Sequence, residues 1–131
     1  MRLFGPFIEG LRTAIDLYSV RHRVISENLA NVETPGYRAR DLDFRATLEQ
    51  AFTPQPARAG GEPIAIADLG IDARPQVVID RSTPIKVDGN SVDVDHEMAR
   101  LSENAIRITA LSRMLARHYE GLKSAIEGGR R

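Results

Sequence analysis

The sequence predicts a mainly α-helical chain whose long N- and C-terminal helices form an antiparallel, coiled-coil-like pair. Apolar residues recur at alternating steps of three and four near both ends, the middle shows no such period, and a Thr-Pro-Gly-Tyr turn follows the first series and ends its helix. We expect one chain-level domain in three parts: an N-terminal helix in residues 1–33, an irregular connecting segment in 34–92 and a C-terminal helix in 93–131.

The N-terminal helix is expected to begin near Pro6, because proline is tolerated in a first helical turn, and to end at about Ala30 or Asn31. Its heptad seam is a narrow apolar stripe that needs another helix to cover it. This N-terminal seam consists of Ile8, Leu11, Ile15, Tyr18, His22, Ile25, Leu29 and Val32. His22 interrupts the apolar series, either to set helix register or, as the less favoured alternative, to sense pH.

The connecting segment starts at residues 34–37, where proline in the second and glycine in the third position predict a type II turn. A short helix is expected next, since Phe44, Leu48 and Phe52 lie four residues apart. Residues 53–74 are rich in Pro, Gly and Ala and predict a long loop. The two apolar runs that follow, at 76–80 and 84–87, are candidates for the strands of a small β-hairpin.

A second turn is expected at residues 88–90, just before the C-terminal helix. Asp93 and Asp95 are expected to cap this helix, because carboxylates at a helix start accept hydrogen bonds from free amides and interact favourably with the helix dipole. The helix is expected to run to about Glu127, where glycines end it. The C-terminal seam consists of Met98, Leu101, Ala105, Ile108, Ser112, Leu115, Tyr119, Leu122 and Ile126.

Composition argues against several function classes. Eighteen basic residues balance eighteen acidic ones, so nucleic-acid binding through general positive charge is not expected. The absence of cysteine removes disulfides, thiolate zinc sites and cysteine nucleophiles. The first nine residues hold no sustained apolar run, so we expect no cleaved secretory signal. No window approaches the roughly twenty apolar residues of a membrane-spanning helix, so no direct membrane insertion is expected.

We predict no catalytic, metal-binding or cofactor-binding site, and therefore no enzyme. The densest polar cluster consists of Asp88, Asn90, Asp93, Asp95, His96 and Glu97. A metal site is the alternative there, but helix capping accounts for the acidic residues without an ion, and the glycine does not stand where a calcium loop needs it. The sequence contains no nucleophile motif and no glycine-rich phosphate loop.

Two motif blocks carry a resemblance to a known family. The first resembles the signature of flagellar rod and hook proteins, in which a helix ends at an Ala-Asn pair before a Thr-Pro-Gly-Tyr turn. This block consists of Asn28, Leu29, Ala30, Asn31, Val32, Glu33, Thr34, Pro35, Gly36 and Tyr37. Its continuation in residues 38–44, and the second block in residues 88–101, are similar to proximal rod proteins of the FlgB type.

The resemblance implies a structural subunit of the bacterial flagellar basal-body rod, which crosses the periplasm and transmits torque from motor to hook. The implied partners are other copies of the chain, other rod proteins, the adapter at the base of the rod and the flagellar type III export apparatus. Two alternatives stay open. One is the sister rod protein of the FlgC type, whose usual Tyr-x-x-Asn element is not found near Ile108. The other is a soluble coiled-coil adapter or chaperone that binds a helical partner.

We predict that assembly uses the apolar seam residues of both helices. One helix pair covers only narrow stripes, so the free subunit is expected to be loosely folded until neighbours pack around it. The predicted assembly interface consists of Ile8, Leu11, Ile15, Tyr18, Ile25, Leu29, Met98, Leu101, Ile108, Leu115, Tyr119 and Leu122.

Overall fold

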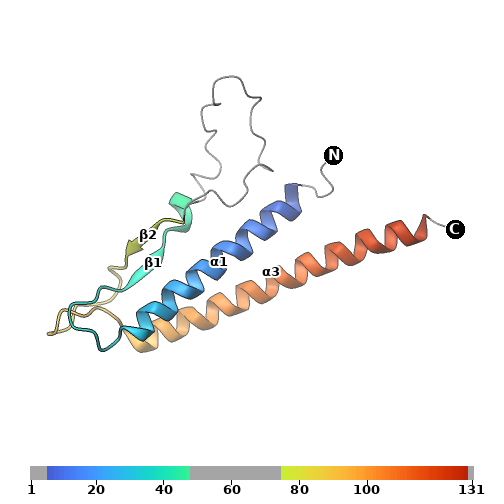
Figure 1. Cartoon of the computed structure of the whole chain (residues 1–131). Coiled ribbons are helices and arrows are strands. Elements are labelled where there is room, and N and C mark those ends of the chain that lie inside the picture. Colours follow the sequence, from blue (N-terminus) through green and yellow to red (C-terminus); the bar gives the residue numbers. More distant parts are fainter. Residues whose placement is uncertain (1–5, 48–74, 130–131) are drawn as a thin grey trace, which may run out of the picture.

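The computed structural model describes residues 6–47 and 75–129. It confirms the predicted fold class: helix α1 spans Pro6–Ala30 and helix α3 spans Val94–Gly128. The two helices lie side by side in antiparallel directions (Figure 1). With 35 residues against 25, α3 is about 15 Å longer than α1. Its C-terminal end therefore extends past the start of α1.

Local sequence explains where α3 begins and ends. The carboxylate of Asp93 accepts a hydrogen bond from the backbone N–H of His96 (3.1 Å), which is the geometry of an N-cap. Asp95 lies in the first turn, where a negative charge interacts favourably with the helix dipole. At the other end the N–H of Gly129 donates to the carbonyl of Ala125 (3.2 Å). These contacts satisfy backbone groups that a helix terminus leaves open.

The chain reverses after α1 through the predicted type II turn. The N–H of Tyr37 donates to the carbonyl of Thr34 (3.2 Å), and Gly36 has a φ of +73°. A positive φ at the third position defines this turn type and favours glycine there. The backbone then leads directly into the small sheet.

The sheet has two antiparallel strands, β1 (Arg40–Leu42) and β2 (Val77–Ile79), with Arg40 opposite Ile79. It packs against α1 on a different side from α3 (Figure 1). We expected residues 84–87 to pair with β2 in a hairpin. This prediction is wrong, because β2 pairs with β1 instead. Residues 84–87 instead lead into a turn in which the N–H of Gly89 donates to the carbonyl of Lys86 (2.9 Å).

The expected short helix is only partly within the described residues. Residues 44–47 are helical, and the remainder of the expected helix to Phe52 lies outside the described part, as does the expected loop at 53–74. We therefore describe the connection only up to residue 47 and again from residue 75.

The core of the described residues is small and contains many polar groups. Its buried apolar side chains are Ile8, Leu11, Leu17, Val24, Ile25, Ala39, Leu42 and Val92. Its buried polar side chains are Asn28, Thr47, Asn90, Ser91, Glu97 and Asn104. Buried polar groups cost free energy unless they are hydrogen-bonded, so their partners decide how this fold is held together.

Candidate assembly site

The structure divides the predicted interface residues into three groups by their exposure. The buried residues are Ile8, Leu11 and Ile25, all in α1. The half-buried residues are Ile15, Tyr18 and Leu29 in α1 and Leu101, Ile108 and Leu115 in α3. The exposed residues are Met98, Tyr119 and Leu122, all in α3. The predicted interface is therefore partly used within one chain and partly uncovered.

The face of α3 that is covered within the chain agrees with the predicted seam at Leu101, Ile108 and Leu115. It differs at the seam positions between them, which are exposed. Between residues 97 and 115 the covered positions are Glu97, Arg100, Leu101, Asn104, Ile108, Leu111 and Leu115. Sequence reasoning selected Met98 and Ala105 because they are apolar and passed over their polar neighbours Glu97 and Asn104. Leu17 and Val24 of α1 are also buried and lie off the predicted seam. Helix α1 contacts β1 as well as α3, so more than one of its faces is covered.

Asn28 joins three elements at the end of α1. Its fully buried side-chain amide donates to the carbonyl of Arg40 (2.7 Å) and to Oε2 of Glu97 (3.1 Å). The amide oxygen accepts from the backbone N–H of Arg40 (3.0 Å) and from the hydroxyl of Tyr37 (3.3 Å). Both donors and both acceptor positions of the amide are thereby used. Asn28 therefore hydrogen-bonds to the edge of β1 that faces away from β2, as a neighbouring strand would. It also links α1 to α3 through Glu97.

Asn90, in the second motif block, binds the turn that follows α1. Its buried amide nitrogen lies within hydrogen-bond distance of the carbonyls of Asn31 (2.9 Å), Val32 (3.1 Å) and Thr34 (2.8 Å). Its amide oxygen accepts from the N–H of Val92 (2.7 Å). Asn90 therefore stabilises the point at which the chain leaves α1.

The two motif blocks also contact each other through their glycine turns. Gly36 and Gly89 have φ values of +73° and +82°. The N–H of Gly36 donates to the carbonyl of Asp88 (2.9 Å), and the N–H of Ser91 donates to the carbonyl of Tyr37 (3.0 Å). A Cβ atom at Gly89 would lie 3.3 Å from the Cα of Gly36, so the turns approach closely. Sequence reasoning identified both turns but not their contact.

Five charged side chains fill the space between α1, the sheet and α3. Arg21 donates two hydrogen bonds to Asp41 (2.8 and 2.7 Å). Arg100 forms an ion pair with Asp80, and its Nη1 lies 3.6 Å from Oδ2 of Asp41 and 3.9 Å from Oε1 of Glu97. Each side chain is at most 17% exposed, so water and salt screen these attractions less than at the surface.

Two carboxyl groups of this cluster have pKa values shifted in opposite directions. Burial raises the pKa of Glu97, although Asn28 and Arg100 act against that shift. Burial also acts to raise the pKa of Asp80, but hydrogen bonds from Ser82 and the charge of Arg100 outweigh it, so the pKa is lowered. The Oε1 atom of Glu97 has no hydrogen-bond partner among the described residues. Glu97 is therefore the carboxyl group of this cluster whose ionisation destabilises the folded chain.

Asn104 is a polar residue buried between the two helices. Its amide nitrogen donates to the backbone carbonyl of Tyr18 (2.9 Å), and Arg107 donates to the Tyr18 hydroxyl (3.1 Å). A directional hydrogen bond within a helix seam fixes the register of the pair. His22 and Ser112 are both exposed. Within the helix pair, the register role expected of His22 therefore belongs to Asn104.

The polar junction is the name we give to Asn28, Asn90, Glu97, Arg100, Asn104 and the two glycine turns.

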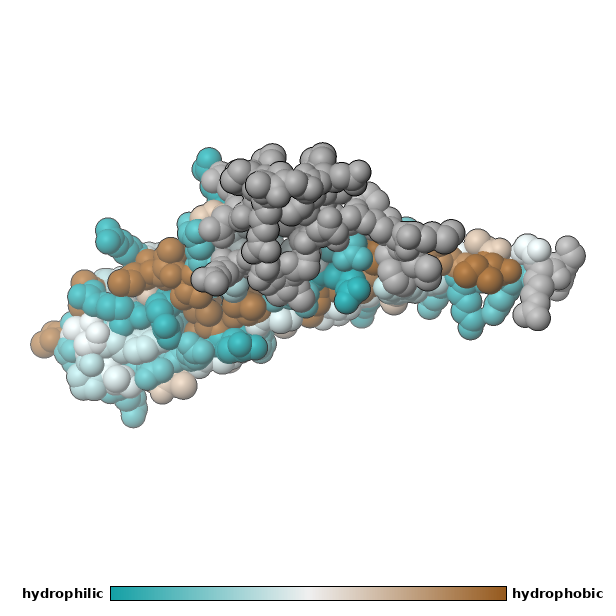
Figure 2. Space-filling view, turned by 45° about the horizontal axis from the view of Figure 1, so that its top comes forward, coloured by the Kyte–Doolittle hydropathy of each residue, from teal (hydrophilic) through white to brown (hydrophobic). Residues whose placement is uncertain are grey.

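The exposed apolar residues of the helices are Phe7, Val94, Met98, Ile106, Met114, Tyr119, Leu122 and Ile126. Phe7 contacts the ring of His118 (5.7 Å between centroids), so residues 119–128 extend beyond the described part of α1. Figure 2 shows apolar surface near this C-terminal end of α3. Ile126 there is 75% exposed.

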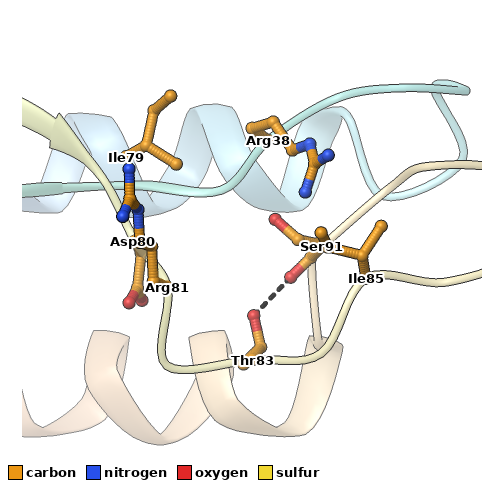
Figure 3. A pocket seen from close by; sticks show the side chains of 7 residues that line it. All are labelled: Arg38, Ile79, Asp80, Arg81, Thr83, Ile85 and Ser91. Atoms are coloured by element: carbon orange, nitrogen blue, oxygen red, sulfur yellow. Dashed lines mark hydrogen bonds between the residues drawn. The ribbon is translucent and has the colours of Figure 1, made fainter.

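A pocket of about 420 Å³ lies beside β2 (Figure 3). It is lined by Arg38, Ile79, Asp80, Arg81, Thr83, Ile85 and Ser91. The hydroxyl of Thr83 donates to the carbonyl of Ser91, and Asp80 is paired with Arg100. The Thr83 hydroxyl is thereby bound to a backbone carbonyl, and the Asp80 carboxylate to an arginine.

No group of three or more His, Cys, Asp or Glu side chains in residues 6–47 and 75–129 is arranged to hold a metal ion. Within the same residues, no helix is both long enough and apolar enough to span a bilayer. What the described arrangement offers chemically is binding: a hydrogen-bonded polar junction at one end and uncovered apolar surface along α3.

Known proteins resemble the chain along nearly its whole length. It is 30% identical to the flagellar basal body rod protein FlgB of Bacillus subtilis over 131 residues, which cover 99% of this chain and 100% of that protein. It is 33% identical to FlgB of Cereibacter sphaeroides over 115 residues, covering 88% and 89% of the two chains. Identity to FlgB of Salmonella typhimurium is 26% over 123 residues, covering 88% and 89%. No family model matches the chain.

Proposed function

Since the chain belongs to the FlgB family of flagellar basal body rod proteins, we propose that it is a rod subunit that assembles through its terminal helices and transmits torque from motor to hook. The observation that carries this proposal is the uncovered apolar surface of α3. Exposed apolar residues follow one another along this helix, whereas scattered single ones would need no explanation.

The polar junction supports the mechanical part of the proposal. Torque passes through a subunit only if the angle between its helices is fixed. Asn28 and Asn90 hold the end of α1 by directional hydrogen bonds, and Asn104 bonds α3 to α1. Such bonds resist rotation and sliding better than apolar contacts, which are not directional.

The proposed partners are other copies of the chain, other rod proteins, the adapter at the base of the rod and the flagellar type III export apparatus. We place the assembled subunit in the periplasmic part of the basal body, exported without a cleaved signal. N-terminal sequencing of the subunit from purified basal bodies tests the export route. It is expected to begin at the translated N-terminus, and a shortened N-terminus would contradict this route.

Deletion in the source bacterium tests the function directly. The deleted strain is expected to lack rods and motility, and the full chain supplied in trans is expected to restore both. Purified basal bodies from the restored strain are expected to contain the protein. Normal flagella in the deleted strain, or absence of the protein from basal bodies, would overturn the proposal. A soluble adapter or chaperone would be absent from the purified structure even if its deletion reduced motility.

A further inference from the structure

Strand β2 has an outer edge that no strand of the described residues covers. The backbone N–H of Asp80 donates to the carbonyl of Ala39 (2.8 Å), so these two residues form a bonded pair across the sheet. Bonded and non-bonded pairs alternate in an antiparallel ladder, so Val77 and Ile79 belong to non-bonded pairs. Their backbone N–H and C=O groups therefore point away from β1.

The opposite edge of the sheet is covered by a side chain. Arg40 faces Ile79 across the ladder, and its outward N–H and C=O are bonded to the amide of Asn28 (3.0 and 2.7 Å). No side chain of the described residues does the same for Ile79. Proteins commonly protect a strand edge with charge or proline, but β2 consists of Val-Val-Ile, whose side chains are 41–56% exposed. The edge of β2 is therefore available for pairing with another chain.

The pocket beside β2 adds side-chain recognition to this edge (Figure 3). Ile79 and Ile85 supply apolar surface to it, and each is 56% exposed. Arg38 and Arg81 supply two guanidinium groups from different segments of the chain. Both arginines are exposed, and neither forms a hydrogen bond or an ion pair with another described residue. Apolar surface between two unpaired cations fits a ligand with apolar and acidic side chains.

The carboxylate that lines the pocket does not cancel these charges. Figure 3 shows the carboxylate of Asp80 pointing toward α3, whereas Arg81 extends to the opposite side, toward Ile79. Alternate residues of an extended chain face opposite sides, which accounts for this separation. On its own side Asp80 is paired with Arg100. The outer side of the pocket therefore presents uncompensated positive charge.

We propose that an extended segment of a different protein of the flagellar rod adds to β2 as a third strand. Its backbone pairs with the outward N–H and C=O groups of Val77 and Ile79. An apolar side chain of the segment packs on Ile79 and Ile85, and an acidic one binds Arg38 and Arg81. In this mode of recognition the main chain supplies affinity and the side-chain pocket supplies specificity. The proposal rests on the function proposed above, and it leaves the polar junction unchanged.

Charge argues against a second copy as the occupant. Within the described residues, the uncovered sheet edge that another copy offers is β2 itself, because β1 is covered by β2 and Asn28. Pairing β2 with β2 would bring the Arg38 and Arg81 side chains of both copies to one contact. Like charges that face each other destabilise a pair of strands. An acidic segment of a different protein instead neutralises them.

Photocrosslinking in assembled basal bodies tests the contact. Benzoylphenylalanine is incorporated at Ile85 or, as the control, at Val87, which is more exposed but does not line the pocket. Irradiation is expected to join position 85 to a different protein, and mass spectrometry is expected to place the crosslink within a few residues of an Asp or Glu. Products only with a second copy or within the chain, a crosslinked segment without an acidic residue, or an equal yield from position 87 would overturn the proposal.

Two variants with the same change in net charge test the arginines. Arg81→Glu is expected to lower the yield of the crosslink from position 85 about tenfold, because attraction becomes repulsion. Lys86→Glu changes an exposed cation outside the pocket and is expected to keep the parental yield. Both side chains are exposed, so the free variants are expected to keep the unfolding midpoint of the parent. Equal yields from the two variants would overturn the proposal.

A proline variant tests the strand pairing. Ile79→Pro removes an N–H that faces away from β1, so the bonds between β1 and β2 are expected to remain, as circular dichroism of the free subunit can check. It is expected to lower the crosslink yield about tenfold, whereas Ile79→Val keeps the N–H and the yield. Parental yield from a folded proline variant would overturn the proposal, and the charge variants decide if that variant does not fold. Absence of the parent chain from basal bodies would instead count against the proposed function.

Discussion

The two ends of the helix pair are held by different kinds of interaction. At the closed end, where α1 stops and α3 starts, the polar side chains of Asn28, Asn90, Ser91 and Glu97 are buried, and each makes at least one hydrogen bond. At the open end, residues 119–128 of α3 are all exposed, including Tyr119, Leu122 and Ile126. The closed end is complete within one chain, whereas the open end has apolar surface with nothing in the described chain to cover it.

This difference suggests separate roles: the closed end sets the shape of the subunit, and the open end provides surface for assembly. Hydrogen bonds depend on angle and distance, so the closed end specifies how the chain reverses and in what register the helices pair. Apolar contacts tolerate many partners, so the open end can be completed by whichever helix is brought to it. Substitutions at the closed end are therefore expected to affect the free subunit. Substitutions at the open end are expected to affect assembly alone.

The largest expected effect comes from Asn28→Ala at the closed end. The change leaves the backbone groups of Arg40 and the carboxylate of Glu97 without the partner that Asn28 supplies. Each buried polar group left unpaired costs about 1–3 kcal/mol, so we expect the free energy of unfolding to fall by about 3 kcal/mol or more. Urea denaturation followed by circular dichroism measures this loss.

Asn31→Ala is the matched control for this prediction. Asn31 belongs to the same motif, but its side-chain hydrogen bonds within residues 6–47 and 75–129 are local, to the carbonyl of Glu27 (2.8 Å) and the hydroxyl of Thr34 (3.1 Å). We expect a loss of about 1 kcal/mol or less. Equal losses for the two variants would mean that the polar junction does not hold the closed end as described.

The same comparison shows what the sequence could and could not predict. The helices follow from spacing, and the turn at Gly36 follows from the order of proline and glycine, so both appear in the structure close to their predicted positions. The role of Asn28 could not be derived from spacing, since its partner Glu97 is 69 positions away. A motif can mark such a residue, but only the fold shows what it contacts.

The interface prediction was limited for a related reason. A search for apolar periodicity cannot select Glu97 or Asn104, because their burial is made possible by hydrogen bonds from distant residues. It therefore selected Met98 and Ala105, the apolar neighbours on the exposed flank of α3. The prediction of the strand pairing was wrong for the same reason. Nothing local in residues 77–79 indicates that their partner is β1, on the other side of a long connection.

The next largest effect is expected from the contact between the glycine turns. Ala at either Gly36 or Gly89 forces a side chain onto a backbone with positive φ, which costs about 1 kcal/mol. At Gly89 the new Cβ also meets the backbone of Gly36 at 3.3 Å, whereas at Gly36 it meets open space. We expect Gly89→Ala to lose about 2 kcal/mol and Gly36→Ala about 1 kcal/mol in urea denaturation.

The difference between these two variants isolates the close approach, because the backbone strain is common to both. Gly121→Ala provides a control of opposite sign, since Gly121 lies within α3 with open space around it. It is expected to raise helix stability by about 0.5–1 kcal/mol. If Gly36→Ala proved as damaging as Gly89→Ala, the close approach of the two turns would add no cost beyond the backbone strain.

A smaller effect is expected from the charge on Glu97 and depends on pH. The pKa of Glu97 is raised in the folded chain, so its contribution to stability is fully present below its unfolded pKa and is lost as pH rises through the folded pKa. Glu97→Gln removes this term. The stability of the variant relative to the parent is therefore expected to increase with pH from about 4.5 upward and then to become constant.

Asp80 provides the internal contrast for this titration. Its pKa is lowered, so its contribution is present above its unfolded pKa and is lost as pH falls. Parent and Glu97→Gln share this acid-side loss, so subtracting their urea-denaturation curves at each pH leaves the Glu97 term. A difference that stayed constant between pH 4 and 8 would show that the carboxylate is not destabilised by its surroundings.

The smallest effect on the free subunit is expected at the open end. Leu122→Ser changes a side chain that is 39% exposed and lies beyond the described start of α1, so the free energy of unfolding should change by at most about 0.5 kcal/mol. Leu101→Ser, the same change on the covered face of α3, is expected to lose about 2 kcal/mol. Basal bodies purified from cells that carry Leu122→Ser should nevertheless contain less of the subunit than the parent strain. If this variant weakened the free fold as much as Leu101→Ser, the open end would already be packed within one chain, and no neighbour would be needed to cover it.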